Sequence, residues 1–139
     1  MEEDDFTLCV LDNARKAARA VSRHYDRLAR QVGMTAGQFS VLVAVRGSER
    51  ATTAGLAERL SMERTTLVRN IALLERKGLV TSVPVTGGRG KSFRLSASGA
   101  ALLERAVPLW RQAQADVKAH LGGEDFLQTI NALKKLSDL

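Results

Sequence analysis

Residues 52–95 constrain the fold of this 139-residue chain more than any other segment, because they combine helix and hairpin patterns in a fixed order. The predicted elements are, in order, a helix over 53–60, a helix over 63–77, a strand over 79–84, a turn over 86–91 and a strand over 93–95. Gly78 is expected to end the second helix. This order predicts a winged helix-turn-helix, a fold that places its second helix in the major groove of DNA.

The same segment carries most of the positive charge of the chain. It holds eight Lys or Arg residues against three Glu, which is +5 of the net charge of +6. The isoelectric point is about 10.1, which favours a polyanionic partner. Arginine outnumbers lysine fifteen to six, and a guanidinium group can donate two parallel hydrogen bonds to a phosphate or a base edge. The charge therefore predicts double-stranded DNA as the partner.

DNA contacts are expected from the first turns of the helix over 63–77 and from the turn of the hairpin. The predicted contact residues are Arg64, Thr65, Thr66, Arg69, Asn70, Arg89 and Lys91. Arginine suits guanine or phosphate, threonine suits phosphates or thymine methyl groups, and Asn70 suits adenine only if it faces the groove. Arg89 is expected in the minor groove and Lys91 on a phosphate. Leu67, Ile71 and Leu74 are expected to face the core instead.

Amphipathic helices are predicted on both sides of this segment, over about 5–31 before it and in two stretches after it. Pro108 should bend the first of the two later helices. The residues expected to cap helices are Thr35, which forms a capping-box pattern with Gln38, and Ser96 or Ser98.

The predicted fold class is mainly α with a small β-wing, in one domain over 1–139. Residues 34–96 form the expected DNA-binding region, and 1–32 and 98–139 form the expected dimerisation helices. These terminal helices carry more apolar surface than a winged domain of this size must cover, so we expect a homodimer with two recognition helices for a palindromic site. In the alternative, the long helices fold back on their own domain.

Composition argues against several other classes of protein. The single cysteine, Cys9, rules out an internal disulfide, and no Cys and His spacing suits zinc. The acidic start differs from a signal peptide and the apolar runs are too short to span a bilayer, so a cytoplasmic protein without membrane contact is expected. An enzyme is disfavoured, because Cys9, His24 and His120 have no placed acid beside them. We expect no metal and no cofactor.

Five short motifs follow one another in an order and spacing that is specific as a set. They are MTAGQF at 34–39, LAERL at 56–60, RTTLVRN at 64–70, LERKGLV at 74–80 and LSASG at 95–99. With them, essentially the whole chain resembles the MarR family of winged-helix transcriptional regulators. The resemblance implies an obligate homodimer that binds a short inverted repeat, usually represses, and is released by a small, often aromatic or anionic ligand.

The family wing usually has an Asp two residues before the arginine that matches Arg89, and this chain has Gly87 there. The Asp helps to hold the arginine, so the resemblance implies a looser and less selective wing.

The resemblance also implies a ligand cleft between the dimerisation helices and the winged region. The residues expected to line it are Arg19, Arg23, His24, Tyr25, Phe39 and Trp110. The arginines would suit an anionic ligand. In the alternative, the aromatic residues belong to the core and the arginines are solvated.

Two other functions remain open from the sequence. Cys9 lies roughly where the family's organic-hydroperoxide sensors keep their reactive cysteine, so one alternative is a redox-sensing regulator. The nearby acidic residues oppose this alternative, because a reactive thiol needs a stabilised thiolate. The second alternative is a non-specific architectural DNA-binding protein, which would share the salt dependence of a regulator but not its sequence preference.

Overall fold

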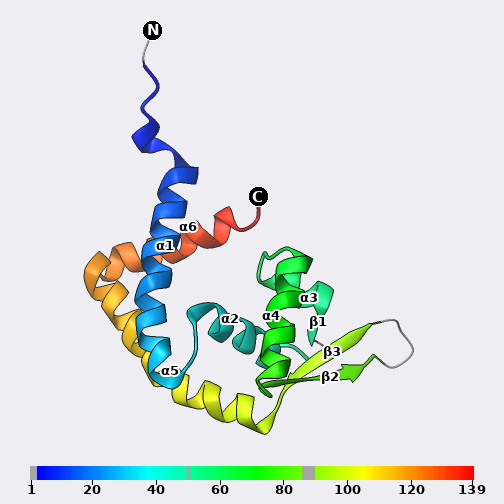
Figure 1. The fold of residues 1–139 in the computed structure, drawn as a ribbon. Coiled ribbons are helices and arrows are strands. Elements are labelled where there is room, and N and C mark those ends of the chain that lie inside the picture. Colours follow the sequence, from blue (N-terminus) through cyan, green and yellow to red (C-terminus); the bar gives the residue numbers. More distant parts are fainter. Residues whose placement is uncertain (1–2, 50, 86–89) are drawn as a thin grey trace.

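A computed structural model of the chain describes residues 3–49, 51–85 and 90–139 (Figure 1). In these ranges the elements are η1 (Phe6–Leu8), α1 (Val10–Ala29), η2 (Arg30–Val32), α2 (Ala36–Arg46), β1 (Ala51–Thr52), α3 (Thr53–Arg59), α4 (Arg64–Arg76), β2 (Val80–Pro84), β3 (Lys91–Leu95), α5 (Ala97–Leu121) and α6 (Gly123–Leu136). The two η elements are short 3-10 helices that flank α1. The predicted fold class, mainly α with a small β-wing, is confirmed.

The sheet has the strand order β1-β3-β2, and each neighbouring pair is antiparallel. Strands β2 and β3 form the predicted hairpin, in which Val80 pairs with Leu95. Lys91 begins β3, although the sequence placed it in the turn. Strand β1, which pairs Ala51 with Phe93, was not predicted. Two residues are too few for an alternating pattern to reveal a strand.

Side-chain caps fix the starts of α2, α3 and α5, and those of α2 and α5 were predicted. At α2, the Thr35 hydroxyl accepts a hydrogen bond from the Gln38 backbone amide, and the Gln38 side chain accepts one from the Thr35 amide. This reciprocal pair is the predicted capping box. At α5, the Ser96 hydroxyl accepts from the Gly99 amide, so Ser96 and not Ser98 is the cap.

The start of α5 packs against Gly78 and Leu79, which lie between α4 and β2. Gly78 follows α4 with a φ of 72°, a left-handed conformation that favours glycine. The Ser96 hydroxyl donates to the Gly78 carbonyl over 2.6 Å, and the Ser96 amide donates to the Leu79 carbonyl over 3.1 Å. A Cβ atom at Gly99 would overlap the Leu79 carbonyl. Glycine at 99 therefore allows the close approach of α5 to the residues that follow α4.

The core lies between the winged elements and the first half of α5. Helix α4 turns Leu67, Ile71 and Leu74 inward, as predicted, and they pack in one cluster with Leu42 of α2 and Leu103 of α5. All five side chains are at most 3% exposed. This core holds α4 in place, so its opposite face is presented in a fixed orientation.

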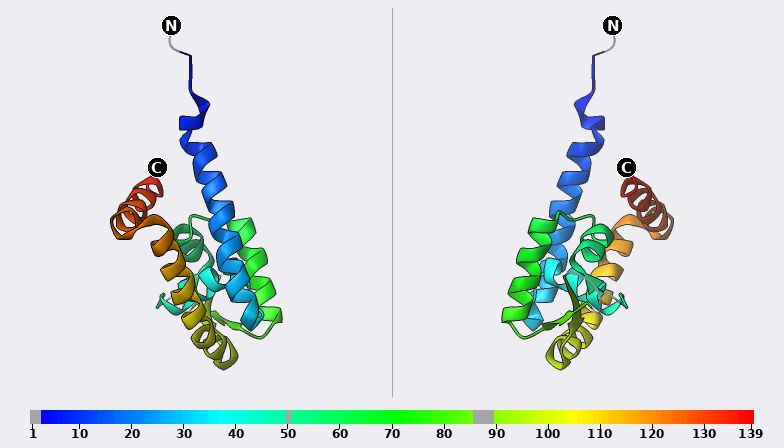
Figure 2. Two further views of the ribbon diagram at one scale, coloured as in Figure 1. Left: turned by 90° about the vertical axis from the view of Figure 1, so that its left-hand side faces the viewer. Right: turned by 90° about the vertical axis from the view of Figure 1, so that its right-hand side faces the viewer.

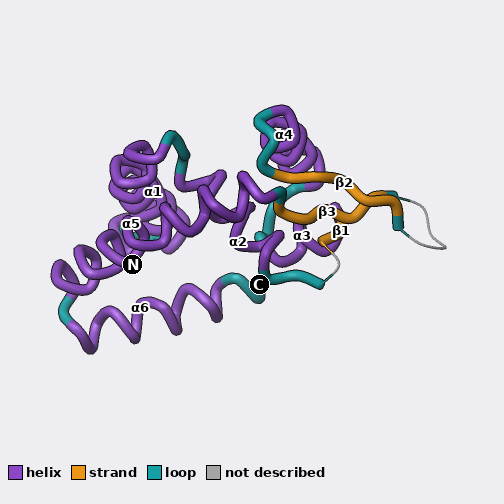
Figure 3. The backbone as a smooth tube through the Cα atoms, turned by 90° about the horizontal axis from the view of Figure 1, so that it is seen from below, coloured by secondary structure: helices purple, strands orange, loops and turns teal. Residues whose placement is uncertain are grey.

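The terminal helices lie mostly outside this core. Figure 2 shows the start of α1 extending beyond the rest of the chain, and Figure 3 shows most of α6 lying away from the sheet. No residue of α6 is buried, and every residue from 10 to 23 is exposed. Helix α5 runs unbroken through Pro108 but changes direction along its length (Figure 1), which agrees with the predicted bend.

Candidate nucleic-acid interface and effector cavity

Helix α4 exposes basic and polar residues in its first turns, while Leu67, Ile71 and Leu74 face the core. Arg64, Thr65 and Arg69 are all exposed, and they occupy the first turns of the helix. Within the described ranges neither arginine has a carboxylate within ion-pair distance. Arg59 of α3 differs, because its guanidinium donates to the Ala44 carbonyl and the Ser48 hydroxyl over 3.4 and 3.2 Å. The α4 arginines are therefore available for a ligand outside the chain.

Asn70 follows Arg69 on α4 and is half-buried. Its side-chain amide donates to the Thr66 carbonyl over 3.0 Å and contacts the Met62 sulfur at 3.8 Å. The sequence left open whether Asn70 faces the groove or sits on the inward shoulder of the helix, and the structure places it on the shoulder. The Thr66 side chain itself is exposed.

The hairpin extends from the sheet beside α4, and it points away from the terminal helices (Figures 1 and 3). Lys91 is exposed at the first position of β3. Arg94, on the same strand, is exposed as well, while Phe93 between them points into the core. Arg89 lies outside the described residues, and so does Gly87, which stands where the family usually has Asp.

Val68 on α4 and Arg94 on β3 are exposed but were not among the predicted contacts. The alternation of the strand would have identified Arg94 as outward-facing, and helical spacing from Arg64 would have identified Val68.

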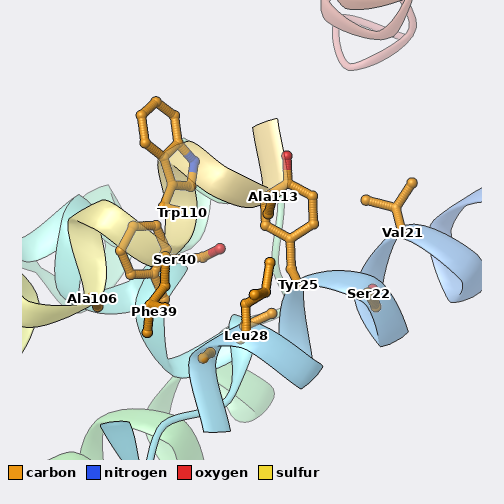
Figure 4. Close-up of a pocket in the computed structure, with 13 residues that line it drawn as sticks. Val21, Ser22, Tyr25, Leu28, Phe39, Ser40, Ala106, Trp110 and Ala113 are labelled. Atoms are coloured by element: carbon orange, nitrogen blue, oxygen red, sulfur yellow. The ribbon is translucent and has the colours of Figure 1, made fainter. Parts of the chain in front are cut away.

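A cavity of about 340 Å³ lies between α1, α2 and α5. Figure 4 shows aromatic side chains from all three helices around it, Tyr25 from α1, Phe39 from α2 and Trp110 from α5. The remaining lining residues are small or aliphatic, namely Val21, Ser22, Leu28, Ala29, Ala36, Gly37, Ser40, Ala106, Leu109 and Ala113. None of these lining residues is an acid, a lysine, an arginine or a histidine.

The predicted ligand-binding residues do not line a single cavity: some line the first cavity, one lines a second cavity, and two are exposed to solvent. Tyr25, Phe39 and Trp110 line the first cavity, whereas Arg19 and Arg23 line neither cavity and are exposed on α1. His24 lines a second cavity, of about 530 Å³, between α1, α5 and α6. Tyr25 borders both.

A polar cluster joins α1 to α5 beside the second cavity. The His24 ring lies 2.9 Å from the Asp116 carboxylate and 3.1 Å from the Arg27 guanidinium, and Gln112 donates to the other Asp116 oxygen over 2.8 Å. Hydrogen bonds from His24 and then Gln112 lower the pKa of Asp116. The Tyr25 hydroxyl donates to the Gln114 side chain. The Tyr25 pKa is raised, first by burial and then by the negative charge of Asp116.

Cys9 is half-buried at the residue that precedes α1. In the described ranges, no group of three or more His, Cys, Asp and Glu residues is placed to hold a metal ion. Over the same ranges, none of the helices has the length and apolar character needed to cross a membrane.

The chain has clear relatives among proteins of known family and structure. Residues 32–89 match the model of the MarR family. The chain is 39% identical to the transcriptional regulator MosR of M. tuberculosis, crystallised in complex with DNA, over 94% of each chain and with a TM-score of 0.85. No curated protein sequence matches it.

Two more distant structures share the fold. A mutant of MarR from E. coli, complexed with operator DNA, is 24% identical over 96% of this chain and 99% of that chain, with a TM-score of 0.86. BpsR of Bordetella bronchiseptica, whose DNA binding is regulated by 6-hydroxynicotinic acid, is 22% identical over 99% of each chain, with a TM-score of 0.89.

The winged fold, the family match and the likeness to MosR define a transcriptional regulator of the winged-helix class. The chain belongs to the MarR family. The family and the fold are those of regulators and not of enzymes.

Proposed function

We propose that this chain is a dimeric, sequence-specific repressor that binds a short inverted repeat in double-stranded DNA and is released by a small aromatic ligand. One observation carries the proposal. A helix-turn-helix exposes two arginines, Arg64 and Arg69, on the first turns of its second helix, and neither meets a carboxylate among the described residues. Its relative MosR was crystallised with DNA.

The DNA contacts are proposed on three elements. Arg64, Thr65 and Arg69 meet bases or phosphates in the major groove. The exposed Thr66 and Lys91 meet phosphates, and Arg89 enters the minor groove. Asn70 takes part only if its amide leaves the Thr66 carbonyl, so it is the weakest member of the set.

The apolar surface of the terminal helices supports the homodimer. Exposed side chains gather at both ends of the chain, on the segment 6–11 and on α6. They include Phe6 at 76%, Leu8 at 77% and Leu127 at 63% exposed. Monomeric proteins rarely expose such contiguous apolar surface. A second copy of the chain, related by a two-fold axis, would cover both ends and set two α4 helices at neighbouring half-sites.

The first cavity is the proposed effector site. Its volume and its aromatic walls suit a ligand of one or two rings. Because no cation lines it, an anion would lose its hydration there without gaining a partner. We therefore propose an uncharged aromatic ligand rather than an anionic one. Binding between α1, α2 and α5 would change how the terminal helices hold the winged region, and so would move the two α4 helices relative to each other.

Selection of bound duplexes from a random pool tests the proposed function. A specific repressor enriches one inverted repeat and prefers it over random DNA by about 10³ or more. A non-specific architectural protein enriches none. The proposal also implies a cytoplasmic location, where such an operator would be found.

A further inference from the structure

Eleven large apolar side chains are exposed in the described part of the chain, and they are not evenly distributed. Ten of them lie on or beside α1, α5 and α6, the helices of the proposed dimer. The exception is Val68, which is 52% exposed in the middle of α4. Val68 is thus the one exposed large apolar residue of the winged region within the described ranges.

The position of Val68 on α4 places it among the proposed DNA contacts. Residues three and four apart share one helix face, so Val68 lies beside Arg64 and Thr65, and Arg69 follows it directly. The core face is already filled by Leu67 and Ile71, which are 0% and 3% exposed. Val68 therefore contributes little to the packing of its own domain.

Helix propensity does not explain a valine at this position either. A β-branched side chain loses rotamer freedom in a helix, and alanine or a long polar residue is favoured at an exposed site. An apolar group on a basic, groove-facing surface indicates an apolar group on the partner. In the major groove, the only apolar group on a base edge is the C5 methyl of thymine.

We infer that Val68 selects a thymine in each half-site of the operator by packing its methyl groups against the thymine C5 methyl. This inference rests on the proposed sequence-specific binding. It also explains how an A·T pair can be selected when the Asn70 amide, the usual partner of adenine, is bonded to the Thr66 carbonyl.

The experiment removes only the methyl group. Each thymine of the selected operator is replaced in turn by deoxyuridine, at the same place in both half-sites, and the affinity of the full chain is measured by fluorescence anisotropy. Deoxyuridine keeps every hydrogen-bonding group of thymidine. Burial of one methyl group raises the affinity about fourfold. Loss of the two methyl groups at one thymine position, one in each half-site, should therefore weaken binding roughly fifteenfold.

Variants of the protein then assign the effect to Val68. Val68→Ala should lose most of the discrimination between the thymine and deoxyuridine duplexes at that position, because the two γ methyl groups that meet the thymine methyl are gone. Thr81→Ala, which removes an exposed β-branched side chain on β2, should keep the full discrimination. Thermal unfolding of Val68→Ala should match the wild type, since the residue is half exposed.

Three outcomes would overturn the inference. In the first, the wild type binds every deoxyuridine duplex as tightly as the thymine duplex, and in the second, Val68→Ala keeps the whole discrimination. Either result leaves the proposed function intact and removes only the role of Val68. In the third, the random pool yields no preferred duplex, so the proposed function itself fails and the inference falls with it.

Discussion

The winged region and the terminal helices of this chain bury their apolar residues to very different extents. In the winged region the leucines of α4 pack into a closed core, and Val68 is the one large apolar side chain exposed among its described residues. On α6 no residue is buried, and Leu127 and Leu133 are 63% and 51% exposed. The first region has a closed core to which α5 contributes, whereas the second exposes the apolar surface that the proposed second copy would cover.

This difference indicates which kind of partner each region meets. Exposed arginines on a rigid helix suit an anionic, hydrated surface such as DNA. Exposed leucines suit another apolar surface, and the same chain supplies one.

The largest effect is expected for a core leucine of the winged region. Leu67→Ala should lower the free energy of unfolding by about 2–5 kcal/mol, because the side chain is 0% exposed and its loss leaves a cavity. Leu127→Ala, the same change at a 63% exposed site, should cost less than about 0.5 kcal/mol at a protein concentration low enough to keep the chain monomeric. Urea denaturation measures both. Equal losses of unfolding free energy in the two variants would contradict this difference between the winged region and the terminal helices.

A charge on the apolar face of α6 should separate the two copies. Leu133→Glu buries two unpaired carboxylates in a symmetric dimer, so the dimer dissociation constant should rise by about 100-fold or more. Sedimentation velocity over a range of concentrations measures the change. Gln128→Glu adds the same charge at an exposed polar position of the same helix and should have little effect. A wild type that sediments as a monomer at micromolar concentration would contradict the dimer.

Removal of an α4 arginine should weaken operator binding without loss of stability. Arg64→Ala and Arg69→Ala should each cost roughly 1–3 kcal/mol on the preferred operator, measured by fluorescence anisotropy at fixed salt. Arg111→Ala removes an exposed arginine from α5 and serves as the control for charge alone. If all three variants lose the same affinity, α4 has no special role in binding.

The first cavity should distinguish ligands by charge. Trp110 is the only tryptophan of the chain, so its fluorescence reports on the cavity without any DNA present. Naphthalene-2-carboxamide should bind about tenfold or more tightly than naphthalene-2-carboxylate, because the carboxylate meets no cation there.

A cation added to the cavity provides the control. Ser40→Arg places a guanidinium at an exposed lining position and should reverse the preference in favour of the carboxylate. Tighter binding of the carboxylate to the wild type would contradict the proposed ligand class.

The smallest effect is expected from Asp116. Hydrogen bonds from His24 and Gln112 hold its pKa below the ordinary value of 3.8, so the folded state favours the charged carboxylate. The stabilisation is therefore complete above pH 3.8 and is lost as the pH falls below it, through the lower pKa of the folded state. Asp116→Asn should flatten this acid limb of the melting temperature while changing it little at neutral pH. Identical acid limbs would show that the contact has no effect on stability.

Local features of this chain could be predicted from its sequence, and features set by packing could not. The capping box of Thr35 and Gln38 and the inward leucines of α4 depend on spacing within one helix, so they were predicted correctly. Strand β1 has only two residues and exists because β3 pairs with it. A local sequence pattern does not predict such a pairing between distant segments.

The candidate site shows the same limit. Helical spacing located the exposed α4 arginines, but it left the direction of Asn70 open, since that depends on the Met62 sulfur in the preceding turn. The rotation of α1 against α5 decides which of its residues face the cavity. That rotation places Tyr25 at the cavity and Arg19 in solvent, and a sequence periodicity does not specify it.

The most direct test compares two duplexes of equal length and composition, the selected inverted repeat and a copy with one half-site scrambled. At one fixed salt concentration, a dimer that inserts one α4 helix into each half-site should bind the scrambled copy about 100-fold or more weakly. Equal affinity for the two duplexes would contradict the account, because it would mean that this chain holds DNA through charge alone.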